Sequence, residues 1–361
     1  MDGPQYPFSK NVLINGKNPF DCANADGLEC SDAPMAMFNF TAGKTHRLRF
    51  INSGADCLLK VSIDGHTMQV FANDYVEIQP YETDVVTLGI GQRTDVLVTA
   101  KNSTTGAYWL RAFTAPGCSS NDGQNVGKAA IYYNNANRSA LPISSPVADW
   151  DSMWCGNDPL NDTVPIMQLA ASNPGASVTV NAAGHSNGTH GRWWLNNVTA
   201  NVDYNDPILL QAKLGNDSFP ADWNVYQYAS NVPSVRFIVM NRSGNNHPMH
   251  FHGHNIQVLA SSTVPNTTWD GTIVNPSNPQ RRDVQLVIAW GYIVLQWNQD
   301  NPGAWSFHCH IAWHLSAGQV MNILYRPEDM LEIPSNYTAE TCTPWASYSA
   351  QHGVAQIDSG G

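Results

Sequence analysis

The chain has 361 residues, of which 42% are apolar, so it is long enough to form two domains that each bury a core. Its formal net charge is -11 and only 13% of its residues are charged, which excludes the basic surface that binds nucleic acid or an anionic membrane. We therefore expect no nucleic acid and no membrane among its partners.

Short runs rich in β-branched and aromatic residues alternate with clusters of Gly, Pro, Asn and Asp from the start of the chain. They include 47–51, 94–99, 235–240 and 293–297. This spacing is typical of all-β sandwiches. The stretch 134–165, rich in Asn, Ser, Pro and Asp, is the best candidate for a boundary. We predict a first domain at 1–140, a linker at 141–163 and a second domain at 164–361.

The most apolar stretch of the sequence, 284–297, is the only candidate for a membrane span. It is shorter than the roughly 20 residues that a bilayer requires, and Gln285 and Gln296 interrupt it. We predict two buried strands joined at Trp290 and Gly291.

Sequons and cysteines indicate an extracellular protein. Asn-X-Ser/Thr sequons begin at Asn39, Asn102, Asn137, Asn161, Asn187, Asn197, Asn216, Asn241, Asn266 and Asn336. Their spread along a chain with few charges is expected where sugars solubilise the surface. The seven cysteines are an odd number, so at least one has a role other than an internal disulfide. No signal peptide is visible at the start of the sequence, and secretion is inferred from these features.

Two histidine motifs in the second half carry the chemistry. The first is His247-Pro248-Met249-His250-Phe251-His252-Gly253-His254, and the second is His308-Cys309-His310-Ile311-Ala312-Trp313-His314. Successive side chains of an extended strand point to opposite faces, so His308 and His310 share one face and Cys309 takes the other. One tripeptide can therefore serve two metal sites. His250 and His252 have the same spacing and present a second pair.

Two imidazoles and one thiolate, with a weak axial ligand, form the blue-copper electron-transfer site. His247, Cys309 and His314 supply this set. Zinc is the main alternative because His and Cys also bind zinc, but structural zinc sites usually use more than one thiolate. Histidines that only pack or cap turns are the third interpretation.

Both motifs resemble the third and fourth copper motifs of multicopper oxidases, and the nearest likeness is to ascomycete laccases. Weaker matches lie at 11–16, 46–49, 91–93, 281–283, 301–305 and 357–361. The resemblance implies an all-β chain of two cupredoxin-like Greek-key β-sandwich domains, the second and third of the family. The stretch 6–9 resembles the start of the family's second domain, so we expect the first cupredoxin domain to be missing from this sequence.

The resemblance also divides the ligands among three types of copper. It implies His247, Cys309 and His314 for type 1, His250 for type 2, and His252, His308 and His310 for the type 3 pair. The implied activity is one-electron oxidation of small phenolic or aromatic donors, coupled to reduction of dioxygen to water. His254 has no ligand role in the family.

The family uses eight histidines for its trinuclear cluster, and no His-X-His pair precedes His247 in this sequence. We therefore expect a complete type 1 site and half of the cluster ligands. Two other functions stay open, namely an electron carrier that keeps only the type 1 copper and an inactive remnant that binds no copper.

Two residues depart from the laccase pattern. Gln319 lies ten residues after Cys309, where laccases usually carry Leu, Phe or Met beside the type 1 copper. An axial amide oxygen would lower the copper potential, unless a local shift keeps it away from the metal. Lys10 replaces an Asp that helps the phenol proton leave in laccases. A lysine cannot accept that proton, so either other donors are favoured or Lys10 is plain surface.

The cysteines also follow the family pattern. The resemblance implies a Cys118–Cys155 disulfide, and Cys22 with Cys30 can close a local loop. Cys342 matches a position that bridges to the family's first domain, and Cys57 is a candidate buried thiol. The ending 358–361 resembles the plug of the family's solvent channel, with Gly361 in place of a bulky apolar residue.

Overall fold

The structure is a computed structural model that describes residues 8–25, 27, 29–31, 33–118, 121–186, 191–203, 205–332, 336 and 338–353. Residues 6–7, the sequon at Asn187 and the plug-like ending 358–361 lie outside the described residues. No described helix is long and apolar enough to cross a membrane.

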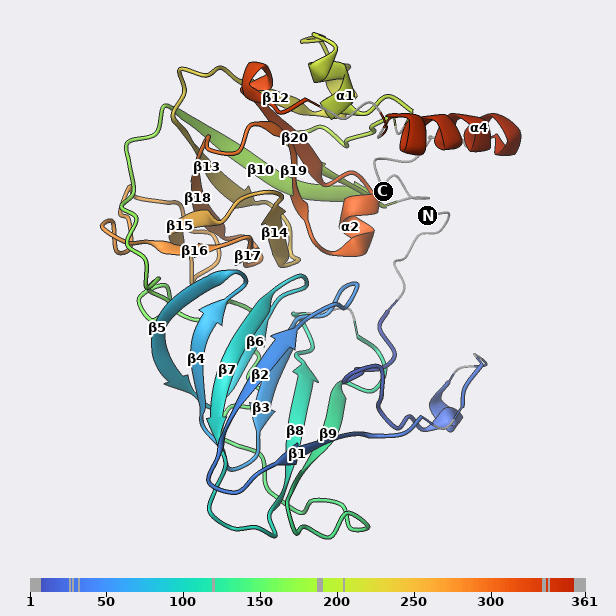
Figure 1. Ribbon diagram of the computed structural model, residues 1–361, viewed down its shortest axis with the longest axis vertical. Coiled ribbons are helices and arrows are strands. Elements are labelled where there is room, and N and C mark those ends of the chain that lie inside the picture. The colour runs from blue at the N-terminus through green and yellow to red at the C-terminus, as the bar shows by residue number, and fades with distance from the viewer. Residues whose placement is uncertain are drawn as a thin grey trace.

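The first half of the chain forms two β-sheets that enclose one core (Figure 1). Its strands are β1 Ala36–Phe40, β2 Thr45–Ile51, β3 Leu59–Ile63, β4 Met68–Asn73, β5 Val76–Thr83, β6 Val85–Leu88, β7 Arg93–Thr99, β8 Ala107–Thr114 and β9 Val126–Tyr133. The sheet orders are β1-β9-β8-β3-β6 and β2-β7-β4-β5. Side chains of a strand point alternately into the core and toward the surface. In β7, Thr94, Val96 and Val98 are accordingly buried, while their neighbours are half-buried or exposed.

The second half repeats this architecture with a larger pair of sheets. Its strands are β10 Ala176–Ser186, β11 Gly191–Leu195, β12 Val225–Tyr228, β13 Ser234–Asn241, β14 His247–Phe251, β15 Ile256–Ser261, β16 Gln280–Arg282, β17 Val284–Val287, β18 Tyr292–Asn298, β19 Gly303–Cys309 and β20 Val320–Tyr325. The sheet orders are β11-β10-β13-β18-β15-β16 and β12-β20-β19-β14-β17. The order in each sheet differs from the order in the chain, so connections cross between sheets as in Greek keys.

Helices are few and short. They are α1 Ile208–Lys213, α2 Ala312–Ser316 and α4 Thr343–His352, with 3-10 turns η1 Cys22–Asn24, η2 Ala221–Trp223 and η3 Pro327–Asp329 and a π-helical turn η4 Thr338–Cys342. The expected all-β fold of cupredoxin-like sandwiches is therefore confirmed.

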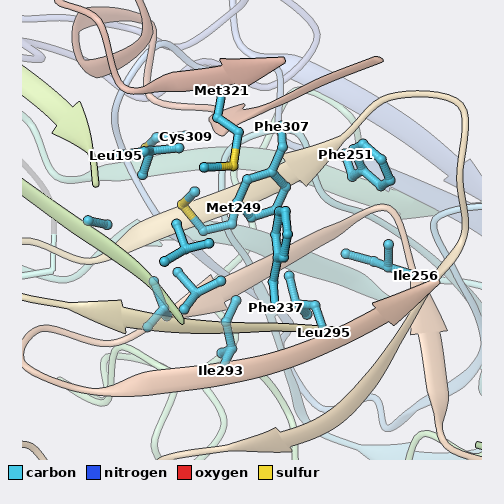
Figure 2. Packing of buried hydrophobic residues seen from close by; sticks show 14 of the residues in the cluster. Leu195, Phe237, Met249, Phe251, Ile256, Ile293, Leu295, Phe307, Cys309 and Met321 are labelled. Carbon is cyan, nitrogen blue, oxygen red and sulfur yellow. The ribbon is translucent and has the colours of Figure 1, made fainter. Parts of the chain in front are cut away.

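The core of the second half lies directly beneath the predicted metal motifs. Phe237, Met249, Phe307 and Met321 pack in one buried cluster that also contains Cys309 (Figure 2). Cys309 thus lies in a dry, apolar environment at the end of β19.

The apolar stretch 284–297 forms two buried strands, as predicted. β17 and β18 contain it, and the turn between them includes Trp290 at φ 58°. Between the halves, β9 ends at Tyr133 and β10 begins at Ala176. Residues 164–166 hydrogen-bond to β5 through Val164 O and Ile166 N. The bounds 1–140, 141–163 and 164–361 stay a prediction.

Candidate copper centres

The first candidate centre joins one residue from each of three elements. His247 begins β14, Cys309 ends β19 and His314 lies on α2. Cys309 Sγ lies 3.5 Å from the Nδ1 atoms of both His247 and His314, and those nitrogens are 3.1 Å apart. Donor atoms with these separations surround a common point at about 2 Å each, which is a metal–ligand bond length.

The strand register explains why the motifs divide into two sets. In the antiparallel pair β14–β19, Met249 lies opposite Cys309 and His250 lies opposite His308. Opposite residues share a face and alternate residues return to it, so His247 joins Cys309 while His250 joins His308. The register therefore places the Cys309 thiol and the His308 imidazole on opposite faces of the strand pair.

Burial keeps the two histidines of this centre neutral. His247 is fully buried, which lowers its pKa to about 3, and burial also lowers the pKa of His314 well below its usual value. Burial raises the pKa of the Cys309 thiol. A metal that binds here therefore meets two neutral imidazoles and must displace a proton from the sulfur.

Two further residues, not singled out by the sequence, hold these imidazoles. The Ser243 hydroxyl lies 2.8 Å from His247 Nε2. The Trp193 ring on β11 lies over His314, with the ring centroids 3.8 Å apart and the planes inclined at 31°. Trp193 is adjacent to another tryptophan and far from both motifs in sequence, so no spacing signal connects it to His314.

The side chain of Gln319 is buried on the same side as Cys309. His308 lies opposite Val320 in the β19–β20 pair, and Cys309 N donates to Gln319 O at 3.2 Å, so Cys309 and Gln319 are opposite neighbours. The Gln319 side chain has no exposed surface, and neither its Oε1 nor its Nε2 has a hydrogen-bond partner among the residues that the structure describes. An orphaned buried amide is costly, and a metal ligand role would satisfy its oxygen.

The second candidate centre lies on the opposite face of the same tripeptide. The ligand atoms of His250, His252 and His308 all lie within 4.8 Å of one another. His252 Nε2 and His308 Nε2 are 2.9 Å apart. The other ring nitrogen of His308 bonds Cys309 O at 2.8 Å, which fixes the ring with Nε2 directed at the group.

His310 lies beside this group rather than within it. Its ring centroid is 5.5 Å from that of His250 and 5.8 Å from that of His308. His250, His252 and His310 line a cavity of about 460 Å³, which residues of the first half close on the other side, including Gly91 and Arg93. Three of the four expected imidazoles thus line one space between the two halves, and His308 lies behind them against His252.

His254, expected to lack a ligand role, uses both ring nitrogens elsewhere. Nδ1 bonds His252 O at 2.8 Å and Nε2 bonds the Tyr325 hydroxyl at 2.5 Å. The ring stacks on Phe251. His254 therefore supports the loop that carries His252.

The predicted disulfides Cys22–Cys30 and Cys118–Cys155 are both present. Cys342 and the buried Cys57 are not in disulfides among the described residues.

Seven of the sequon asparagines are exposed: Asn39, Asn102, Asn137, Asn161, Asn197, Asn266 and Asn336. Asn241 is buried and its amide bonds the Asn245 and Ile288 carbonyls, so this sequon is inaccessible in the fold.

Comparisons with known proteins agree with this geometry. Two family models, each described as multicopper oxidase, match residues 2–136 and 194–329. The chain is 34% identical to Laccase-3 of Botryotinia fuckeliana over 86% of this chain and 70% of that protein. It is 35% identical to Oxidoreductase OpS5 of Beauveria bassiana over 98% of this chain, yet spans only 61% of that relative. The solved laccase of Botrytis aclada superposes with a TM-score of 0.89 at 30% identity, over 98% of this chain and 66% of the laccase.

Proposed function

The chain belongs to the multicopper oxidase family, and from this premise we propose that it acts as a laccase-type copper oxidoreductase. It would oxidise small phenolic or other aromatic donors by one electron at a time and deliver the electrons to dioxygen. One observation carries the proposal: a Cys-His-His set and a group of histidines lie on opposite faces of the β14–β19 pair, with Cys309 of one set adjacent in the chain to His308 of the other.

The chemistry of the donor set fits copper. Two imidazoles and one thiolate at mutual distances of 3.1 to 3.5 Å match a trigonal blue-copper site. When bound, copper supplies reversible one-electron redox chemistry. His247, Cys309 and His314 would hold it, and the apolar core around Cys309 excludes water from the sulfur.

The protein's own residues provide a short route between the two centres. Cys309 connects through its backbone to His308 and His310, whose Cα atoms are roughly 7 Å apart in an extended chain. The hydrogen bond of 2.8 Å from the His308 ring to Cys309 O gives a second connection. His250 would hold the type 2 copper, and His252, His308 and His310 would contribute to the type 3 pair, half of the family's cluster ligands.

Half-reactions test the proposal on the chain as it is. Copper loading is expected to give an intense blue band, which an aromatic donor bleaches under nitrogen and air restores. Cys309→Ser should abolish the band. A blue protein that is bleached but not reoxidised by air would identify an electron carrier, and a colourless protein would identify a remnant without copper.

We also propose that Gln319 Oε1 would be a further, weak ligand of a copper held by His247, Cys309 and His314, and that it would lower the reduction potential of that copper. The orphaned, fully buried amide opposite Cys309 supports this role. Gln319→Leu should raise the reduction potential of the blue copper. Gln299→Leu is a matched control and should leave the potential unchanged. The buried Gln299 amide also lacks a partner among the described residues, but Gln299 follows β18 in the other sheet. An unchanged potential in Gln319→Leu would rule this ligand role out.

We propose that the protein prefers electron donors whose oxidation does not require a proton acceptor at position 10. Lys10 Nζ pairs with Asp122 Oδ2 at 2.9 Å. Its neighbours Ser9 and Asn11 line a cavity of about 650 Å³ together with Trp313, which precedes His314. Lys10→Glu should increase kcat/KM for neutral phenols over that for an anionic donor, and Lys44→Glu on the exposed surface should not. Equal ratios would assign Lys10 to plain surface.

We propose an extracellular location. The exposed sequons and the two disulfides support it, because disulfides persist in oxidising compartments. Sensitivity of the secreted protein's mobility to glycosidase would test the location, and recovery of an unglycosylated intracellular protein would contradict it.

A further inference from the structure

The turn 89–93 belongs to the first half, contains no histidine itself and lies against His310 of the second half. It joins β6 to β7 at the end of the first half that faces β14 and β17 (Figure 1). Gly91 has φ +82°, and a Cβ added there would lie 2.5 Å from His310 Cδ2 and 2.7 Å from His310 Nε2. The imidazole of His310 therefore rests directly on the Gly91 backbone, in a space that only glycine leaves open.

His310 needs such a support because it lies one residue beyond the end of β19. Its backbone N donates to Pro248 O at 2.7 Å, which fixes the main chain. The ring bonds its own backbone and packs against Gly91 on one side. A metal ligand that is held by packing in this way keeps the geometry that binding requires.

The turn itself is clamped to the second half by Gln92. This side chain has no exposed surface. Its Oε1 accepts a hydrogen bond from Gly89 N at 2.7 Å, and its Nε2 donates to Val284 O at 2.8 Å. The position of Gly91 is thus set against β17 and not only within the first half.

Arg93 connects the Gly91 backbone to a second histidine of the predicted copper ligands, His250. Its Nη1 donates to Gly91 O at 2.9 Å, and its two Nη atoms bind the Asp283 carboxylate at 2.6 and 2.7 Å. The backbone oxygen of Asp283 bonds His250 Nδ1 at 2.8 Å, which leaves Nε2 as the ligand atom. Arg93 therefore links the backbone of Gly91, on which the His310 ring packs, to the residue whose carbonyl orients the His250 ring.

We propose that the turn 89–93 positions His310 and His250 relative to each other for copper, with Gly91 and Arg93 as positioning residues. The half of the chain without predicted copper ligands thereby sets the geometry of the cluster ligands. This inference rests on the proposed copper function.

The test compares Gly91→Ala with Gly43→Ala in the full chain. Gly43 also has a positive φ, +67°, but a Cβ there would meet only Asn102 Oδ1 at 3.1 Å. Both variants should lose thermal stability through backbone strain at a positive φ, and Gly91→Ala should lose more because its Cβ also meets the His310 ring. Only Gly91→Ala should shift the His310 ring signals in NMR of the copper-free protein and weaken copper binding at the histidine group, by about 10- to 100-fold. The blue band should remain unchanged in both.

Arg93→Lys keeps the charge but loses the bidentate pair, and it should alter the type 2 copper EPR signal without altering the blue band. Arg93→Lys also tests the positioning role of the turn 89–93 if Gly91→Ala does not fold. The inference would be overturned if Gly91→Ala kept the ring signals, the copper affinity and the EPR spectrum of the parent. If Gly91→Ala is unfolded, the same result in Arg93→Lys would overturn it. A parent chain that never turns blue would instead count against the proposed function.

Discussion

Lys60 is a buried cation in the first half, far from the copper centres in sequence. Only 3% of its surface is exposed, and its Nζ donates to the Thr87 hydroxyl at 2.9 Å. Burial lowers the pKa of Lys60 to about 8, and the charge of Asp158 opposes this shift. Between pH 8 and the ordinary lysine value, the unfolded chain binds a proton that the folded chain does not, so stability rises with pH across this window.

Below pH 8 the folded protein therefore carries the full cost of a buried ammonium group. Lys60→Met should increase the free energy of unfolding at pH 7 by on the order of 1 to 3 kcal/mol, and the gain should shrink as the pH approaches 10. Urea titrations at several pH values measure it, with the exposed Lys44→Met as the control. A gain that does not depend on pH would show that packing, not charge, is responsible.

At the scale of elements, the two disulfides differ in the length of chain that they close. Cys118–Cys155 joins residues 37 apart and ties the loop after β8 to the segment between the two halves, whereas Cys22–Cys30 joins residues 8 apart. Loop-closure entropy predicts roughly 4 kcal/mol of stabilisation for the first and roughly 2.5 kcal/mol for the second. Paired serine variants should show this order in unfolding experiments, and the reverse order would mean that local contacts outweigh the entropy term.

The elements that carry the metal motifs were predictable from the sequence because their signals are local. The period of two in His308-Cys309-His310 predicts opposite faces, and the turn at Trp290 and Gly291 divides one apolar run into two strands. Trp193 was not predictable, because its ring contact with His314 joins residues 121 positions apart in sequence. The contact between Gly91 and the His310 ring depends on how the two halves pack against each other, and no local sequence pattern encodes that packing.

At the scale of the whole molecule, a buried charge network joins the two halves. Asp74 lies at the tip of the β4–β5 hairpin with φ 52°, and its carboxylate has no exposed surface. It binds Arg282 of the second half at 3.0 and 3.1 Å and accepts a hydrogen bond from Arg93 N at 2.9 Å. Burial alone would raise the pKa of the Asp74 carboxyl, but the charges of Arg282 and Arg93 and these hydrogen bonds outweigh burial and lower the pKa, so the group is ionised at neutral pH.

Removal of this carboxylate should uncouple the halves, because it leaves the buried Arg282 guanidinium without its partner. Asp74→Ala is expected to cost about 3 to 5 kcal/mol and to split a single calorimetric transition into two, with the loss of blue colour following the unfolding of the second half. Asp329→Ala removes the exposed pair with Arg326 and should cost less than about 1 kcal/mol, since solvent screens it. If Asp74→Ala still unfolds in one transition, the halves are joined mainly by apolar contact, and the positioning of His310 by Gly91 would then survive loss of the network.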